Sequence, residues 1–161
     1  MNERLVHWDV SCRANGHDPV FRFVPITGMP PDMNVVCFVA VEKDNPTVKR
    51  TNALNRWIYG RFAIDAEHGD EHYSYAQPFF LSHSEISLPA YPAETMAPLL
   101  ERAGLNAQEY ADDGLFLLRS TVMSHYHVMA AETGHKQALL AEFVELLAQK
   151  VDLALAALAV F

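Results

Sequence analysis

Basic residues and cysteines are scarce in this sequence. Its 161 residues include 12 Lys and Arg against 20 Asp and Glu, which gives a formal net charge of −8, and no basic run is present. Because a chain this acidic repels phosphate backbones, we expect no nucleic-acid partner. The two cysteines, Cys12 and Cys37, have neither metal-binding nor redox spacing, and each lies in an apolar run. We interpret them as small buried side chains in a reducing compartment and expect a cytoplasmic protein.

The sequence also lacks long hydrophobic segments and clustered glycines. The first residues contain no apolar stretch of the kind found in secretory signals, and the most apolar segment, residues 153–161, is too short to span a bilayer. We therefore expect no membrane partner. The seven glycines are dispersed, which argues against a phosphate-binding glycine loop, and no nucleophile elbow is present.

The proportions of apolar and charged residues favour a folded domain. Apolar residues make up 50% of the sequence and charged residues 20%, a balance that provides enough apolar surface for a core. The length of 161 residues fits one domain over residues 1–161.

Apolar runs with strand periodicity predict a sheet. Residues 5–12 alternate apolar and polar side chains, and Asn15-Gly16 after them suits a tight hairpin turn. The continuous apolar run at 34–41 indicates a central strand that is covered on both faces. Further strands are predicted at about 21–26, 76–87 and 115–123.

Apolar residues at three- and four-residue spacing predict the helices. Leu54, Trp57, Ile58 and Phe62 indicate an amphipathic helix over about 50–63. The longest stripe predicts a helix from about 135 towards the end of the chain; it consists of Leu140, Phe143, Val144, Leu147, Val151, Leu155 and Leu158.

Capping residues predict a short helix and one further helical turn between the two amphipathic helices. We expect Thr95 to cap a helix that carries Pro98 in its first turn and ends at Gly104. Asn106 with Glu109 resembles a capping box for one more turn.

The expected order of elements is three strands, then helix, strand, helix, strand and helix. This order predicts an α/β (α+β) fold, with a small mixed or antiparallel sheet, helices packed on one face and a long C-terminal helix. The initial hairpin requires an antiparallel pair, and helical crossovers permit parallel ones.

Two histidine patterns raise the question of a metal site. Residues 68–72 (His-Gly-Asp-Glu-His) match a metallopeptidase pattern, but Gly69 and Asp70 lie inside it and no apolar stripe supports a helix. His125-Tyr-His127 with Glu132 imitates a ligand set whose fold needs several more strands after it. We interpret these as a solvated loop and a strand end, and predict no metal site.

Arg119 lies within the strand predicted at 115–123, on the face shared with Leu117, Thr121 and Met123. A guanidinium in this position calls for an anionic partner, and its planar fork fits a carboxylate through two parallel hydrogen bonds. That partner is a substrate or a structural Glu or Asp; in a third reading the side chain extends to solvent. The residue pattern leaves these three alternatives open.

Several segments resemble, in the same order, the C-terminal small domain of pyridoxal-phosphate-dependent group II amino-acid decarboxylases, nearest to the tyrosine decarboxylase-like branch. The resemblance spans about residues 18–155; residues 1–17 lie outside it as an N-terminal extension, and residues 153–161, which overlap its end, form an apolar tail. The segments are Phe21-Arg-Phe-Val, Met33-Asn-Val-Val-Cys-Phe-Val, Thr51-Asn-Ala-Leu-Asn-Arg-Trp-Ile-Tyr, Phe80-Leu-Ser82-His83, the helix Leu-Leu-Glu-Arg-Ala-Gly-Leu, and Leu117-Leu-Arg119-Ser-Thr-Val-Met.

The resemblance implies the small-domain fold of aspartate-aminotransferase-type enzymes and part of a lyase of amino-acid metabolism. In many members the matching arginine holds the carboxylate of the amino-acid substrate, and in others it is structural, so the first role is implied for Arg119. Ser120, Ser82 and His83 would lie near the substrate cleft.

One departure from the family concerns the cofactor. Family members bind pyridoxal phosphate in a large upstream domain, through a lysine that follows a histidine. His135-Lys136 imitates that dipeptide, but it comes after the arginine strand. A lysine that forms a Schiff base also needs desolvation. We therefore expect no cofactor on this chain alone, and assign no catalytic residue.

Two hypotheses of function follow. In the first, the chain is a fragment, separate subunit or remnant of a decarboxylase for an aromatic amino acid such as tyrosine. Its partner would be the missing cofactor-binding domain or a second copy of the chain, and it would be catalytically silent alone. In the second, it is a non-catalytic acidic interaction or inhibitor module, an alternative favoured by the charge of −8 and the apolar tail.

Overall fold

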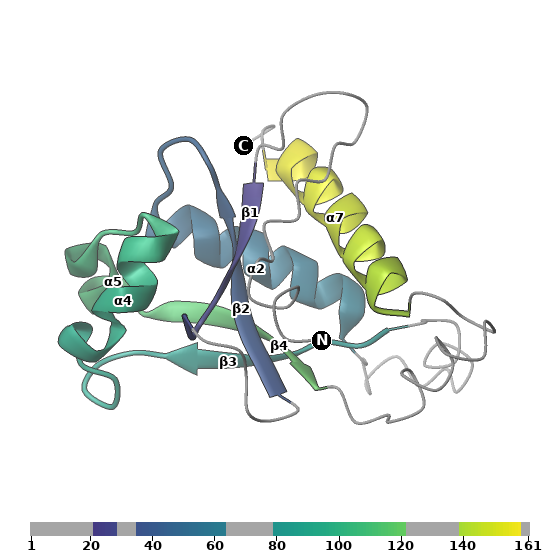
Figure 1. Ribbon diagram of the computed structural model, residues 1–161. Coiled ribbons are helices and arrows are strands. Elements are labelled where there is room, and N and C mark those ends of the chain that lie inside the picture. The colour runs from purple at the N-terminus through teal and green to yellow at the C-terminus, as the bar shows by residue number, and fades with distance from the viewer. Residues whose placement is uncertain (1–20, 29–34, 64–78, 122–138, 159–161) are drawn as a thin grey trace.

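The described residues form a four-stranded antiparallel sheet with helices on both faces (Figure 1). A computed structural model describes residues 21–28, 35–63, 79–121 and 139–158. The strands are β1 (Phe21–Pro25), β2 (Val35–Glu42), β3 (Ser82–Ile86) and β4 (Leu115–Thr121), and their order in the sheet is β1-β2-β4-β3. Each neighbouring pair is antiparallel. The predicted fold class is confirmed.

The helices differ in length and in the sheet face that they cover. They are α2 (Val48–Phe62), α4 (Ala93–Ala103), α5 (Ala107–Asp113) and α7 (Leu139–Leu158). In Figure 1, α4 and α5 lie together at one end of the sheet, whereas α2 and α7 lie next to each other. No helix in the described part of the chain is long and apolar enough to cross a bilayer.

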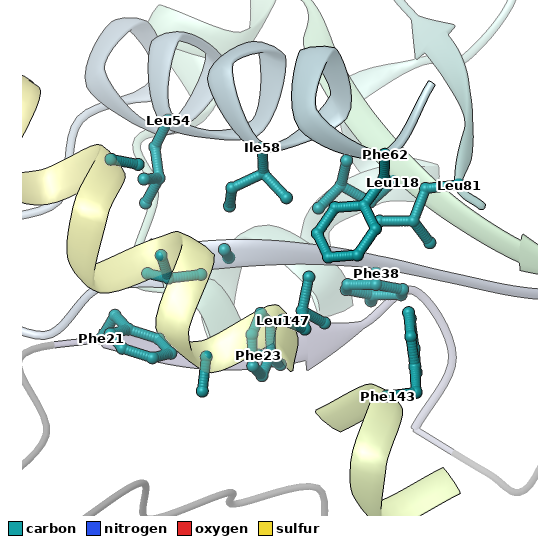
Figure 2. Packing of buried hydrophobic residues seen from close by; sticks show 14 of the residues in the cluster. Phe21, Phe23, Phe38, Leu54, Ile58, Phe62, Leu81, Leu118, Phe143 and Leu147 are labelled. Atoms are coloured by element: carbon teal, nitrogen blue, oxygen red, sulfur yellow. The ribbon is translucent and has the colours of Figure 1, made fainter. Parts of the chain in front are cut away.

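Alternation along the strands divides the interior into two cores. Phe38 and Ala40 of β2 point to the face under α2 and α7, and Val39 and Val41 point to the face under α4 and α5. Figure 2 shows the first, which we name the α2–α7 core. Its buried residues are Phe21, Phe23, Phe38, Ala40, Leu54, Ile58, Phe62, Leu81, Phe116, Leu118, Phe143, Leu147, Ala148, Val151 and Ala154.

The second cluster, the α4–α5 core, lies on the opposite face of the sheet. Its buried residues are Val24, Val39, Val41, Val48, Ile86, Met96, Leu99, Leu100, Ala103, Leu105, Tyr110, Leu115 and Leu117. The expectation that the helices pack on one face is therefore corrected: it holds for the two long helices, and the short pair covers the other face. The reason is that β2 and β4 carry apolar residues on both faces, so both faces must be buried.

Helix ends follow the capping chemistry with one exception. Thr47 caps α2 by accepting a hydrogen bond from the Arg50 amide, Gly104 ends α4 in the left-handed conformation, and Asn106 caps α5. Thr95, however, does not cap α4. That helix begins at Ala93 after Pro92, which places Pro98 in its interior rather than its first turn.

Other predicted boundaries differ by a few residues or lie outside the described ranges. β3 begins at Ser82, later than the predicted start near residue 76, and α2 begins at Val48 rather than near residue 50. The strand predicted at 5–12 and the turn at Asn15-Gly16 lie outside the described residues.

Two buried asparagines on α2 join the central strands where their pairing stops. β2 and β4 pair from Val35 opposite Thr121 to Phe38 opposite Leu118. Beyond that point the side chain of Asn55 accepts from the Ala40 amide and donates to the Ala40 carbonyl, at 2.9 and 2.8 Å.

The side chain of Asn52 likewise forms hydrogen bonds with backbone groups at the start of β4. It accepts from the Phe116 amide at 2.8 Å and donates to the Gly114 carbonyl at 3.1 Å. Both asparagines are buried, so their amides replace the missing ladder bonds of two strands and fix α2 against the sheet.

Candidate functional site

Arg119 lies near the end of β4, one of the two central strands, with a neighbour on each side. It is paired with Cys37 of β2 and with Ser82 of β3. Because directly opposite residues of an antiparallel pair point to the same face, these three side chains form a row across three strands. We name it the Arg119 row. All three side chains are half-buried.

The contact between Arg119 and Ser82 is specific. The Arg119 Nε donates to the Ser82 Oγ at 2.8 Å, and the same hydroxyl donates to the Arg119 carbonyl at 3.2 Å. Within the described ranges the ion pairs belong to other arginines, namely Arg50 with Glu42 and Arg56 with Glu85. No carboxylate of the described residues therefore neutralises Arg119, and the structural ion pair that the sequence left open has no partner there.

The positive charge of Arg119 affects the pKa of its other neighbour, Cys37. Burial raises the pKa of the Cys37 thiol, and the Arg119 guanidinium lowers that pKa as a weaker, opposing influence. The sequence predicted a buried thiol, whereas the Cys37 thiol is half-buried and lies beside a cation. The pairing that places it there could not be derived from the local sequence pattern.

The other two candidate residues lie on the opposite face of the sheet. Ser120 is paired with Val36, which packs against the α2–α7 core. His83 stacks on the ring of Phe116, with centroids 4.8 Å apart and planes 4° apart. The structure therefore brings Arg119 and Ser82 together and places Ser120 and His83 on the other side of the sheet.

His83 belongs to a group of aromatic and charged side chains between α2 and β3. The Tyr59 ring meets the His83 ring at 4.4 Å, and Arg56 lies 5.1 Å over the Phe116 ring while pairing with Glu85 at 3.2 Å. Arg56 and Glu85 are exposed, so this ion pair contributes little to stability. The group connects β3, which is at the edge of the sheet formed by the described strands, to α2.

The described residues contain neither a cluster of metal ligands nor a fully buried lysine. They hold no group of three or more His, Cys, Asp or Glu that could bind a metal, and both histidine patterns of the sequence lie outside them. Of the lysines in the described ranges, Lys43 and Lys49 are exposed and Lys150 is half-buried. A Schiff-base lysine needs desolvation, so these residues do not fit pyridoxal phosphate. Lys136 lies outside the described part.

The fold and the row define a small α/β domain with a cationic side chain on a central strand, flanked by the Cys37 thiol and the Ser82 hydroxyl. Comparison with known families agrees with the resemblance carried by the sequence. The family model "Tyrosine decarboxylase, C-terminal" matches residues 14–150, and the chain therefore belongs to this family. Decarboxylases of this family depend on pyridoxal phosphate in general. No curated protein matches the chain.

Proposed function

We propose that the chain is the domain of a pyridoxal-phosphate-dependent decarboxylase that closes over an aromatic amino acid such as tyrosine, and that Arg119 binds the substrate carboxylate. Two observations support the proposal. The family match covers residues 14–150, and Arg119 is half-buried with no carboxylate partner among the described residues.

The chemistry of the Arg119 row suits carboxylate binding. Its neighbours Cys37 and Ser82 are neutral groups, so no negative charge within the row neutralises Arg119. A guanidinium offers two parallel N–H donors to a carboxylate, and partial burial strengthens such a charge-assisted pair relative to water. Arg119 would hold and orient the substrate acid while the domain excludes water.

The remaining chemistry would come from a partner. Pyridoxal phosphate supplies the electron sink for decarboxylation when it is bound in the complete enzyme. Because the described lysines do not fit that group, we derive no step through it on this chain. The chain alone would be catalytically silent and would act in the cytoplasm together with a cofactor-binding large domain or as a homo-oligomer.

The test is binding of tyrosine to the chain itself, monitored through the NMR signals of the arginine side chains. We expect tyrosine to shift the Arg119 signals, and tyramine, which lacks the carboxylate, to leave them unchanged. Arg119→Gln should weaken tyrosine binding at least about tenfold, since hydrogen bonds to charged groups contribute about 1.5–3 kcal/mol. Arg119→Lys keeps the positive charge but loses the two parallel donors. Its affinity for tyrosine should therefore lie between those of the wild type and Arg119→Gln.

Two results would contradict the proposal. One is equal binding of tyrosine and tyramine, or unchanged tyrosine binding in Arg119→Gln. The other is release of carbon dioxide from tyrosine by the chain mixed with pyridoxal phosphate, because that would require a catalytic site on this chain.

The acidic interaction module is the second candidate, and one structural observation favours it. Leu153, a large apolar side chain on α7 and the first residue of the segment predicted as an apolar tail, is 56% exposed. Under this alternative the Arg119 substitutions would leave tyrosine binding unaffected, whereas Leu153→Lys would disrupt association with a protein partner.

A further inference from the structure

We propose that Ser82 is a positioning residue for the carboxylate site: it holds the Nε edge of Arg119 and thereby leaves only the terminal Nη1 and Nη2 edge for a ligand. This inference rests on the proposed function of Arg119. It adds the direction of approach, namely that a carboxylate binds end-on to the guanidinium rather than side-on.

The hydrogen bonds around the Ser82 hydroxyl carry the argument. A hydroxyl has one proton to donate, and here the Ser82 Oγ directs it to the Arg119 carbonyl at 3.2 Å. Its lone pairs are then available to the Arg119 Nε, which donates to the same oxygen at 2.8 Å. Ser82 thus links the side chain of Arg119 to its own backbone.

The linkage restricts both the rotamer of Arg119 and the edges that it can offer. A carboxylate can bind an arginine side-on, through Nε and one terminal nitrogen, or end-on, through the two terminal nitrogens. Side-on binding would compete with Ser82 for the Nε proton. End-on binding, in contrast, leaves both hydrogen bonds between Ser82 and Arg119 in place. Because Ser82 orders the long Arg119 side chain before the ligand arrives, less conformational entropy is lost on binding, and the affinity for the carboxylate is higher.

The strand provides a matched control. Ser84 lies two residues from Ser82 on the same strand, so both side chains point to the same face. It is also half-buried and is paired with Leu117, an apolar residue of the α4–α5 core. Ser84→Ala removes the same hydroxyl from the same strand away from Arg119.

The experiment compares Ser82→Ala, Ser82→Thr and Ser84→Ala in the chain, with tyrosine as the ligand. We expect Ser82→Ala to speed the exchange of the Arg119 Nε proton with water and to weaken tyrosine binding about three- to tenfold, the effect of one ordinary hydrogen bond. Ser82→Thr should restore both, and Ser84→Ala should change neither. Tyrosine should shift the Nη signals of the wild type more than its Nε signal.

The outcomes separate this inference from the proposed function. If Arg119→Gln weakens tyrosine binding and Ser82→Ala does not, Ser82 is not a positioning residue while the carboxylate site stands. A shift confined to Nε would show side-on binding and overturn the inference. If Arg119→Gln has no effect, the proposed function itself fails. Should Ser82→Ala not fold, Ser82→Cys keeps the size of the side chain with a weaker acceptor, and unchanged Nε exchange in it would also overturn the inference.

Discussion

At the scale of single residues, the buried side chains of Asn52 and Asn55 join α2 to the sheet. Each bonds backbone groups of a strand at the place where β2 and β4 no longer bond to each other. Buried backbone groups that lose their partners cost about 1–3 kcal/mol each. Their replacement is therefore more damaging than the loss of an exposed polar side chain.

We predict that Asn55→Ala lowers the free energy of unfolding by about 2–4 kcal/mol, because the amide and the carbonyl of Ala40 lose their partner together. Urea denaturation followed by circular dichroism measures the change. Ala53 on the same helix is exposed, and Ala53→Ser should stay within about 0.5 kcal/mol of the wild type. A similarly small change in Asn55→Ala would show that water replaces the asparagine amide.

The asparagine pair also shows how far the sequence could be interpreted residue by residue. The apolar residues Leu54, Ile58 and Phe62 were sufficient to predict the helix and its buried face, and all three are buried. Asn52 and Asn55 lie on the same face at helical spacing, which was the available signal. Their partners on β2 and β4 could not be predicted, because they depend on where the pairing of these strands stops.

The same limit applies to the candidate site. Alternation along β4 correctly assigns Arg119 to the face of Leu117, and it separates Ser120 from them. Which residue of β3 lies beside Arg119 is a matter of register, and a shift of one residue would replace Ser82 by His83. The family resemblance named both, and only the three-dimensional pairing distinguishes them.

At the scale of elements, turns and caps explain which boundaries were predicted and which were not. The predicted roles of Gly104 and Asn106 hold because each satisfies backbone groups within its own helix. Thr95 had the right chemistry for a cap, but Pro92 precedes it with φ −58° and ψ 147°, and the Thr95 amide donates to the Pro92 carbonyl. The proline thus ends the loop and starts the helix earlier.

Gly114, between α5 and β4, provides the prediction at this scale. It has φ 63° and ψ −170°, and a Cβ there would lie 2.8 Å from the Ile86 carbonyl oxygen and 3.0 Å from the Ser87 Cβ. We therefore expect Gly114→Ala to lower the free energy of unfolding by at least about 2 kcal/mol. Thermal unfolding of the two variants Gly114→Ala and Gly60→Ala measures it.

Gly60 is the matched control, because it lies within α2 and a Cβ added to it would meet no other atom within 4 Å. Alanine is the better helix former, so Gly60→Ala should raise the free energy of unfolding by about 0.5–1 kcal/mol. If both substitutions changed stability in the same direction, the special backbone conformation of Gly114 would not be the reason for its effect.

At the scale of the whole molecule, the sheet is shared by two cores. The continuous apolar run of β2 had indicated coverage on both faces, and β2 does contribute Phe38 and Val39 to opposite cores. Placing the helices on one face was inconsistent with that run. The sequence thus contained the signal for helices on both faces, and the order of elements alone, from which helices on one face were predicted, did not reflect it.

A shared sheet has a consequence for unfolding. β2 and β4 each supply alternate residues to the α2–α7 core and to the α4–α5 core, so neither core can lose its packing without disturbing the strands of the other. We therefore predict that the described cores unfold in one cooperative transition. Leu147 and Leu99, buried in the first and second core, are the residues that test this.

Leu99→Ala should lower the free energy of unfolding by about 2–5 kcal/mol, as should Leu147→Ala, through the cavities that they leave. Trp57 packs against the α2–α7 core, and in a Trp8→Phe background its fluorescence reports on that core alone. Because the sheet couples the cores, Leu99→Ala must shift the Trp57 transition in urea as far as it shifts the far-ultraviolet circular dichroism. If Leu99→Ala left the Trp57 midpoint unchanged while the circular dichroism became biphasic, the two cores would unfold independently. The sheet would then not couple the face that carries Arg119 to α2 and α7 on the opposite face.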